Sequence, residues 1–116
     1  MLTFFRSLWF SLLWVKSGFM GGRPFFIKKM VIEKFSIKDA VWIETGTFKG
    51  DTTAFLAGLT HSVITIEPDD FLFKKASLRF SKIEKVTVVH GKSETELIKI
   101  TENLAENCNF WLDGHY

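Results

Sequence analysis

Cysteine is nearly absent from this chain, and so is an excess of charge of one sign. Cys108 is the only cysteine, so no disulfide can form within the chain. Its position before an apolar run predicts a small buried hydrophobe and not a zinc ligand. The net charge of +2 is too small to indicate a nucleic-acid partner, so we expect none. These absences are compatible with a reducing compartment, and we expect a cytoplasmic protein.

The N-terminal region lacks a hydrophobic run long enough to cross a membrane. Nine uncharged residues, 7–15, lie between Arg6 and Lys16, and this run is too short for a bilayer core of about 30 Å. Three alternatives stay open for residues 1–19: a helix that packs on the domain or a partner, an amphipathic helix at a membrane surface, and a signal-peptide-like segment, which Lys16 disfavours. We predict an aromatic segment and Gly-rich hinge over 1–24 and a domain over 25–116.

The rest of the chain is rich in apolar residues, and its apolar runs alternate with helix-like stretches. Apolar residues make up 47% and aromatic residues 16%, which is ample material for a core. Each apolar run leads into a polar or Gly-containing turn; the runs are 40–43, 62–66, 86–89 and 110–112, and the expected helices are 25–35, 51–57, 70–82 and 94–106. Such alternation predicts an α/β fold with right-handed crossovers. The last helix is expected to begin with a capping box, Ser93 to Glu96, and to bury its apolar residues Leu97, Ile100 and Leu104.

The turn after the first run, residues 44–50, is the most informative motif. Its sequence, Glu44-Thr45-Gly46-Thr47-Phe48-Lys49-Gly50, has two glycines in a G-x-x-x-G pattern, whereas dinucleotide-binding turns carry three. A carboxylate at the strand end disfavours a pyrophosphate and favours a ligand with an ammonium group. S-adenosylmethionine is such a ligand, although many Gly-rich turns of this kind bind nothing.

A second acidic residue, Glu67, follows the next apolar run. It lies about 20 residues beyond Gly46, which is the spacing at which doubly wound folds place their ribose-binding acid. The alternative is a helix cap, but Asp69 and Asp70 offer better N-cap chemistry for the helix that follows.

Together these motifs resemble a known enzyme family over residues 25–116. The runs 41–47 and 66–69 resemble the first and second motifs of class I S-adenosylmethionine-dependent methyltransferases, and 110–116 is loosely similar to the macrocin-type O-methyltransferase branch. The resemblance implies a Rossmann-like, partly parallel sheet with flanking helices, preceded by N-terminal helices. It covers only the N-terminal half of such a domain, so we expect a sheet truncated after about four strands in the order 3-2-1-4.

The resemblance also implies roles for single residues. It implies that Glu44, Gly46, Thr47 and Gly50 bind the methionine end of the cofactor and that Glu67 binds the ribose. The family's usual adenine-binding acid is replaced by lysine in Gly91-Lys92-Ser93, so the adenine contact is assigned to Ser93. Glu94 is near enough in sequence to compensate for that replacement. Asp113 and His115 are the candidate catalytic bases. Asp113 alone does not specify a metal site, so we expect none.

Two function classes follow. The first is a methyltransferase, or its cofactor-binding half, that uses S-adenosylmethionine and transfers a methyl group to the oxygen of a small hydroxylated acceptor. The second is a non-catalytic remnant that is held at a membrane surface or on a protein partner by its aromatic N-terminus. The sequence gives neither the oligomeric state nor the identity of the acceptor.

Overall fold

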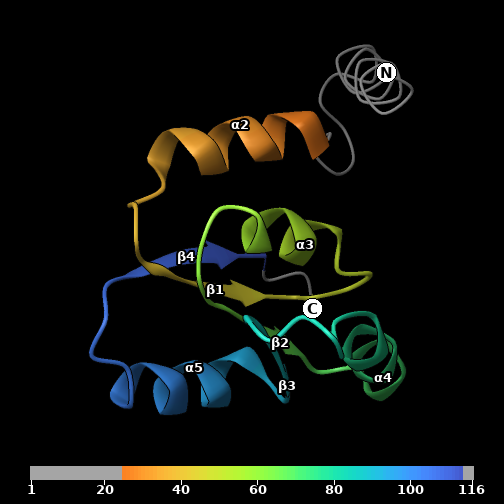
Figure 1. Cartoon of the computed structure of the whole chain (residues 1–116). Helices are drawn as coiled ribbons and strands as arrows, with labels where there is room; N and C mark the ends of the chain where they lie inside the picture. Colours follow the sequence, from red (N-terminus) through yellow and green to blue (C-terminus); the bar gives the residue numbers. More distant parts are fainter. Residues whose placement is uncertain (1–24, 114–116) are drawn as a thin grey trace, which may run out of the picture. The chain divides into compact units, whose positions relative to one another are not determined.

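A computed structural model describes residues 25–113 (Figure 1). The elements in chain order are α2 (Phe25–Phe35), β1 (Val41–Thr45), α3 (Asp51–Ala57), β2 (Val63–Glu67), α4 (Asp70–Arg79), β3 (Val86–His90), α5 (Ser93–Glu102) and β4 (Cys108–Leu112). The chain divides into two units, Met1–Ser36 and Ile37–Tyr116. Helix α2 belongs to the first unit and spans the residues expected from the sequence, whereas the sheet belongs to the second. The N-terminal segment 1–24 and His115 lie outside the described residues.

The four strands form one parallel sheet in the order β3-β2-β1-β4, which confirms the expected α/β fold and strand order. β1 and β2 occupy its centre. All five residues of β1 are buried, and so are four of the five in β2, as expected for strands covered on both faces. Because all strands run in the same direction, their carboxyl ends meet at one edge of the sheet.

Helices α3 and α5 lie on opposite faces of the sheet (Figure 1). The side chains of β1 agree with this arrangement, because successive residues of a strand point to opposite faces. Glu44 is hydrogen-bonded to Thr53 of α3, whereas the next residue, Thr45, lines a pocket with Leu97 of α5. The core of this unit is made of branched aliphatic residues from the central strands and from α3. Its most deeply buried members are Ile43, Leu56, Val63 and Ile66.

Two helices are shorter than the sequence predicts. Helix α4 ends at Arg79 and not near Lys82, because Phe80 leaves the helical path and its ring is buried, while the Ile83 amide bonds to the Phe80 carbonyl in a turn. Helix α5 ends at Glu102 and not near Glu106, and the Asn103 amide closes its last turn on the Ile100 carbonyl.

The capping-box prediction for α5 is wrong. Lys92 is the N-cap residue, and no side chain caps the helix, because Ser93 is already its first residue. The Glu96 carboxylate binds the Lys99 ammonium at 3.2 Å, one turn further along the helix. The expected burial along α5 is also overstated: no residue of α5 is fully buried, and Leu97 and Ile100 are half-buried.

Candidate functional site

The turn between β1 and α3 has the tight backbone that its glycines predict. Gly46 and Gly50 adopt φ angles of 83° and 91°, in the left-handed region that glycine favours. The Gly46 amide donates to the Ile66 carbonyl at 2.9 Å, which holds the turn against β2. A Cβ atom on Gly50 would lie 2.8 Å from the Phe80 ring, so this position has no room for a side chain. Phe48 also has a positive φ of 52°, which is uncommon for a bulky residue.

Glu44 lies inside the domain, where hydroxyl groups surround it. Only 1% of the residue is exposed. The hydroxyls of Thr53 and Thr65 both donate to Glu44 Oε1, the second at 2.7 Å, and the Thr65 and Thr47 hydroxyls are 2.7 Å apart. Charged hydrogen bonds of this kind offset part of the cost of burying a carboxylate. The three threonines thus hold the first acidic residue within the core.

Glu67 is fully buried at the end of β2, and its two oxygens bind two different segments. Oε1 accepts from the Phe48 amide at 2.8 Å, and Oε2 accepts from the Asp69 amide at 2.9 Å. The first bond holds the β1–α3 turn, and the second holds the start of α4. A carboxylate has about four acceptor sites, so these two bonds leave each oxygen further acceptor capacity. Asp69 is the N-cap of α4, because its side chain accepts from the Leu72 amide at 2.8 Å, as the sequence suggested.

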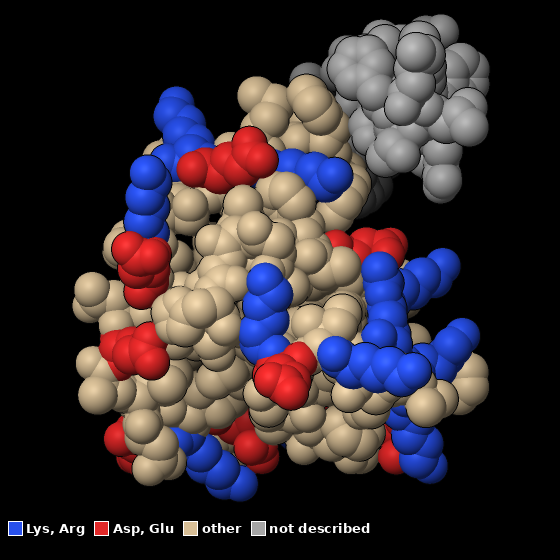
Figure 2. All heavy atoms as spheres, in the orientation of Figure 1, with Lys and Arg blue, Asp and Glu red and all other residues tan. Residues whose placement is uncertain are grey.

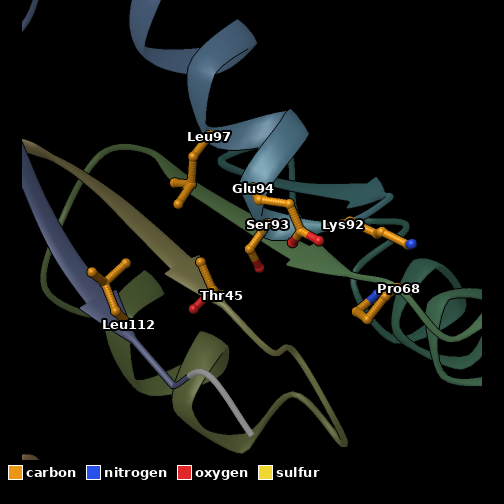
Figure 3. A pocket seen from close by; sticks show the side chains of 7 residues that line it. All are labelled: Thr45, Pro68, Lys92, Ser93, Glu94, Leu97 and Leu112. Atoms are coloured by element: carbon orange, nitrogen blue, oxygen red, sulfur yellow. The ribbon is translucent and has the colours of Figure 1, made fainter. Parts of the chain in front are cut away.

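A pocket of about 570 Å³ opens at the carboxyl ends of the strands (Figure 3). Its lining comes from the ends of β1, β2 and β4 and from the start of α5: Thr45, Pro68, Lys92, Ser93, Glu94, Leu97 and Leu112. Figure 3 shows Thr45 and Leu112 at the strand ends, across the pocket from Leu97. A small polar set on a largely apolar wall is typical of sites for small organic ligands.

Asp113 follows β4 at the same edge of the sheet. Its backbone amide donates to Thr45 Oγ1 at 3.0 Å, and the residue is exposed. The end of β4 is therefore beside the end of β1, as a shared crevice requires. The other candidate base, His115, is outside the described residues.

The structure brings some predicted site residues to the pocket and places others behind it. Of the predicted cofactor residues, Ser93 lines the pocket, and so does Glu94, which was expected to compensate for the replaced acid. Glu67 does not line the pocket, although the next residue, Pro68, does, and the side chains of Glu44 and Thr47 are held in the buried hydroxyl cluster. Their roles toward a ligand stay predictions.

Several other polar residues have structural partners. His90 stacks on Phe73 of the crossover helix α4 with ring centroids 4.6 Å apart, and exposed His61 is 2.9 Å from Glu106. Cys108 is half-buried and not fully buried, because β4 is an edge strand. Within residues 25–113 no three His, Cys, Asp or Glu side chains gather in a way that would hold a metal ion. No helix in that range is long and apolar enough to cross a membrane.

Threonines 53 and 65 are functional candidates that sequence reasoning missed. Both positions read as ordinary members of a helix and a strand. Only the register, in which Glu44 pairs with Thr65 on the neighbouring strand, shows that a hydroxyl lies beside the buried carboxylate. A polar residue at the centre of a β-branched run opposite an acidic residue is the signal that would have revealed it.

Solved structures with the same fold are methyltransferases. An rRNA methylase from Streptococcus thermophilus is 23% identical with a TM-score of 0.58, and the match covers 69% of this chain and 49% of that one. A putative methyltransferase from Streptococcus mutans in complex with SAH is 16% identical with a TM-score of 0.59, covering 83% of this chain and 57% of that one. A dimethyladenosine transferase from Plasmodium falciparum is 18% identical with a TM-score of 0.53, covering 79% and 42%.

The comparisons identify the fold but not a branch within the methyltransferases. No family model and no curated protein matches the chain. The chain spans about half the length of the two streptococcal structures, 49% of one and 57% of the other. The macrocin-type branch is not confirmed by these neighbours. The domain thus has the Rossmann-like fold of the class I S-adenosylmethionine-dependent methyltransferases, with four parallel strands in the order 3-2-1-4.

Proposed function

We propose that this chain binds S-adenosylmethionine at the carboxyl edge of the sheet and belongs to a methyltransferase. The observation that carries the proposal is Glu67, a buried carboxylate at the end of β2 that adjoins the pocket through Pro68 and keeps acceptor capacity for the two ribose hydroxyls. Ser93 and Glu94 at the pocket wall are placed to meet the polar edge of an adenine. The fold shared with a methyltransferase crystallised with SAH supports the same ligand.

The reaction that we propose is methyl transfer to an oxygen of a small hydroxylated acceptor. The cofactor supplies an activated methyl group as its sulfonium, so the protein must mainly align the acceptor and remove its proton. Asp113 is exposed at the crevice edge, beside the end of β1, and its carboxylate is the proposed base. With the cofactor bound, its methyl group would be the one transferred, and the Asp113 carboxylate would take the proton of the acceptor hydroxyl. His115 is the alternative base.

A second candidate acceptor is a nucleic acid. Two of the solved neighbours are named as an rRNA methylase and a dimethyladenosine transferase. The expectation that nucleic acid is excluded, which rested on the net charge of the whole chain, has no support from these neighbours. The alternative to an enzyme, a non-catalytic remnant held on a membrane or partner, would share the fold but not the cofactor affinity.

Titration calorimetry with S-adenosylhomocysteine tests the proposal directly. We expect the wild-type chain to bind, and Glu67→Gln to bind about 10- to 150-fold more weakly, because the weakening of its charged hydrogen bonds to ribose costs about 1.5–3 kcal/mol in total. Gln keeps one acceptor oxygen for the Phe48 or the Asp69 amide, and circular dichroism checks that the fold survives.

The control is Glu106→Gln, which neutralises an exposed glutamate that precedes the amino end of β4, whereas the pocket is lined by the carboxyl end of that strand. It should bind as the wild type does. Absence of wild-type binding would refute the proposal, and an unchanged dissociation constant in folded Glu67→Gln would refute the ribose assignment. Tighter binding of NAD than of S-adenosylmethionine would show that the cofactor is a dinucleotide.

A further inference from the structure

Two exposed phenylalanines each carry a lysine ammonium over the ring. Phe48 and Phe71 are 58% and 66% exposed, although large aromatic side chains usually contribute to cores. Lys49 Nζ lies 5.6 Å from the Phe48 ring centroid, and Lys75 Nζ lies 5.3 Å from that of Phe71. Within residues 37–113 the same ring-and-cation pair thus occurs twice, once on the β1–α3 turn and once on the first turns of α4, and a further pair, Lys34 and Phe35, belongs to the other unit.

The two pairs lie on one continuous surface. Glu67 binds the amides of Phe48 and Asp69 with its two oxygens, so the β1–α3 turn lies against the start of α4. At the other end of α4, Arg79 Nη1 donates to the Lys49 carbonyl at 2.7 Å. The turn is therefore fixed to α4 at both of its ends. We call Phe48, Lys49, Phe71 and Lys75 the aromatic–basic surface.

The surface has cations that the protein does not neutralise. Lys74 is paired with Asp70 and Arg79 with Asp51, both at 2.9 Å. Lys49 and Lys75, in contrast, have no ion-pair partner among residues 25–113. Figure 2 shows basic side chains gathered over and beside α4, on the right of the view. The small net charge of the whole chain conceals this local excess.

We propose that the aromatic–basic surface binds single-stranded nucleic acid. Proteins that hold single strands combine cations for the phosphates with exposed aromatic rings on which bases stack. Here rings and lysines interleave, which matches a polymer in which planar bases and phosphates alternate. A lipid surface would instead favour a helix with one unbroken apolar face, and on α4 the exposed Phe71 and Leu78 are separated by Lys74 and Lys75.

The β2–α4 turn links the surface to the pocket, because Glu67 binds the Phe48 amide and the next residue, Pro68, lines the pocket. A strand bound there would run past the edge at which the cofactor is proposed to bind. Its role as the methyl acceptor rests on the function proposed above, whereas the binding itself does not.

Fluorescence anisotropy with a labelled oligouridine of about 12 nucleotides, within the range of known site sizes, tests the surface at several salt concentrations. The double variant Lys49→Gln/Lys75→Gln should lower the slope of log K against log salt by about 1.4, that is about 0.7 for each lost phosphate contact. The matched control, Lys38→Gln/Lys99→Gln, removes the same charge from exposed positions elsewhere and should keep the wild-type slope.

Ring variants separate stacking from charge. Phe71→Ala should weaken oligonucleotide binding about 5- to 150-fold, as the loss of one stacked base does. Phe48→Asn removes the other ring and suits the positive φ of 52° at this position. Calorimetry with S-adenosylhomocysteine, run on Phe71→Ala, should give wild-type affinity, because Phe71 neither lines the pocket nor belongs to the turn that Glu67 holds.

The outcomes distinguish the two proposals. Loss of oligonucleotide binding in the surface variants supports the surface, whether or not the wild type binds S-adenosylhomocysteine. No oligonucleotide binding, or equal losses in the surface variants and the lysine control, would overturn it. Binding to vesicles of phosphatidylserine and phosphatidylcholine that needs the same four residues, without oligonucleotide binding, would also overturn it and assign the surface to a membrane.

Discussion

Two parts of the sheet domain, β1, β2 and α3 on one side and β4 and α5 on the other, differ in burial and in buried hydrogen bonds. On the side of β1, β2 and α3, buried carboxylates bind hydroxyls and amides, and the central strands are covered on both faces. On the side of β4 and α5, no residue of the helix is fully buried, and Phe110 and Leu112 are 47% and 64% exposed. The predicted cofactor-binding acids, Glu44 and Glu67, thus lie in the buried part of the domain, whereas the predicted base, Asp113, follows the more exposed strand β4. Cofactor affinity and catalysis are therefore expected to depend on regions of different stability.

The largest effect should come from Glu44→Ala. This change removes the acceptor that two buried hydroxyls share, so Thr53 loses this acceptor and Thr65 keeps only the Thr47 hydroxyl beside it. At about 1.5–3 kcal/mol for each of the two hydrogen bonds to a charged group, we expect a loss of about 3–6 kcal/mol in the free energy of unfolding. Urea denaturation measures it, and the chain should lie close to the limit of folding, since small domains have only about 5–15 kcal/mol in total.

Glu44→Gln is the matched control for that experiment. Both hydroxyls donate to one oxygen, Oε1, and a glutamine carbonyl can accept both bonds without the charge. Its loss should be less than half that of Glu44→Ala. Equal losses in the two variants would show that the negative charge, and not the acceptor, stabilises this side of the domain.

The arrangement of the elements was predictable from the sequence, whereas the contacts of the acidic residues were not. The β-branched runs and Gly-containing turns predicted the strands, and G-x-x-x-G predicted a tight turn, in which both glycines have positive φ angles. That Glu67 binds the Phe48 amide depends on how far the turn folds back onto β2, and local sequence does not encode that distance. Ser93 shows the same limit: a shift of one residue in the start of α5 placed it inside the helix and abolished the expected capping box.

The contrast between buried and exposed sides can be tested with one substitution made on each. Leu56→Ala on α3 removes a side chain with 0% exposure, and we expect a loss of about 2–5 kcal/mol from lost transfer energy and the cavity left behind. Leu112→Ala on β4, where the side chain is 64% exposed, should cost less than about 1 kcal/mol.

Denaturation of both variants under one set of conditions compares the two sides directly. If Leu112→Ala costs as much as Leu56→Ala, β4 is covered in solution by something that the described residues do not provide, such as a second copy or a partner. Sedimentation at two protein concentrations would then identify self-association.

The smallest effect concerns acid stability at the start of α4. The hydrogen bond from Lys74 and its positive charge lower the pKa of Asp70 below its usual 3.8. The folded state therefore gains stability from this pair above the unfolded pKa and loses it as the pH falls through the lowered folded value. Thermal unfolding of the wild type and Asp70→Asn should differ at pH 7 and converge once the pH falls below the lowered pKa of Asp70. The difference at pH 7 should be slight, because the pair is exposed and solvent weakens it. Lys74→Gln, which removes the other partner, should also be slightly less stable than the wild type at pH 7 and equally stable at low pH. Glu84→Gln should show no such pH-dependent difference, because Glu84 is exposed and has no ion-pair partner among residues 25–113. A difference that persists at low pH would mean that Asp70 acts through the geometry of the first turn of α4, beside Phe71, and not through its charge.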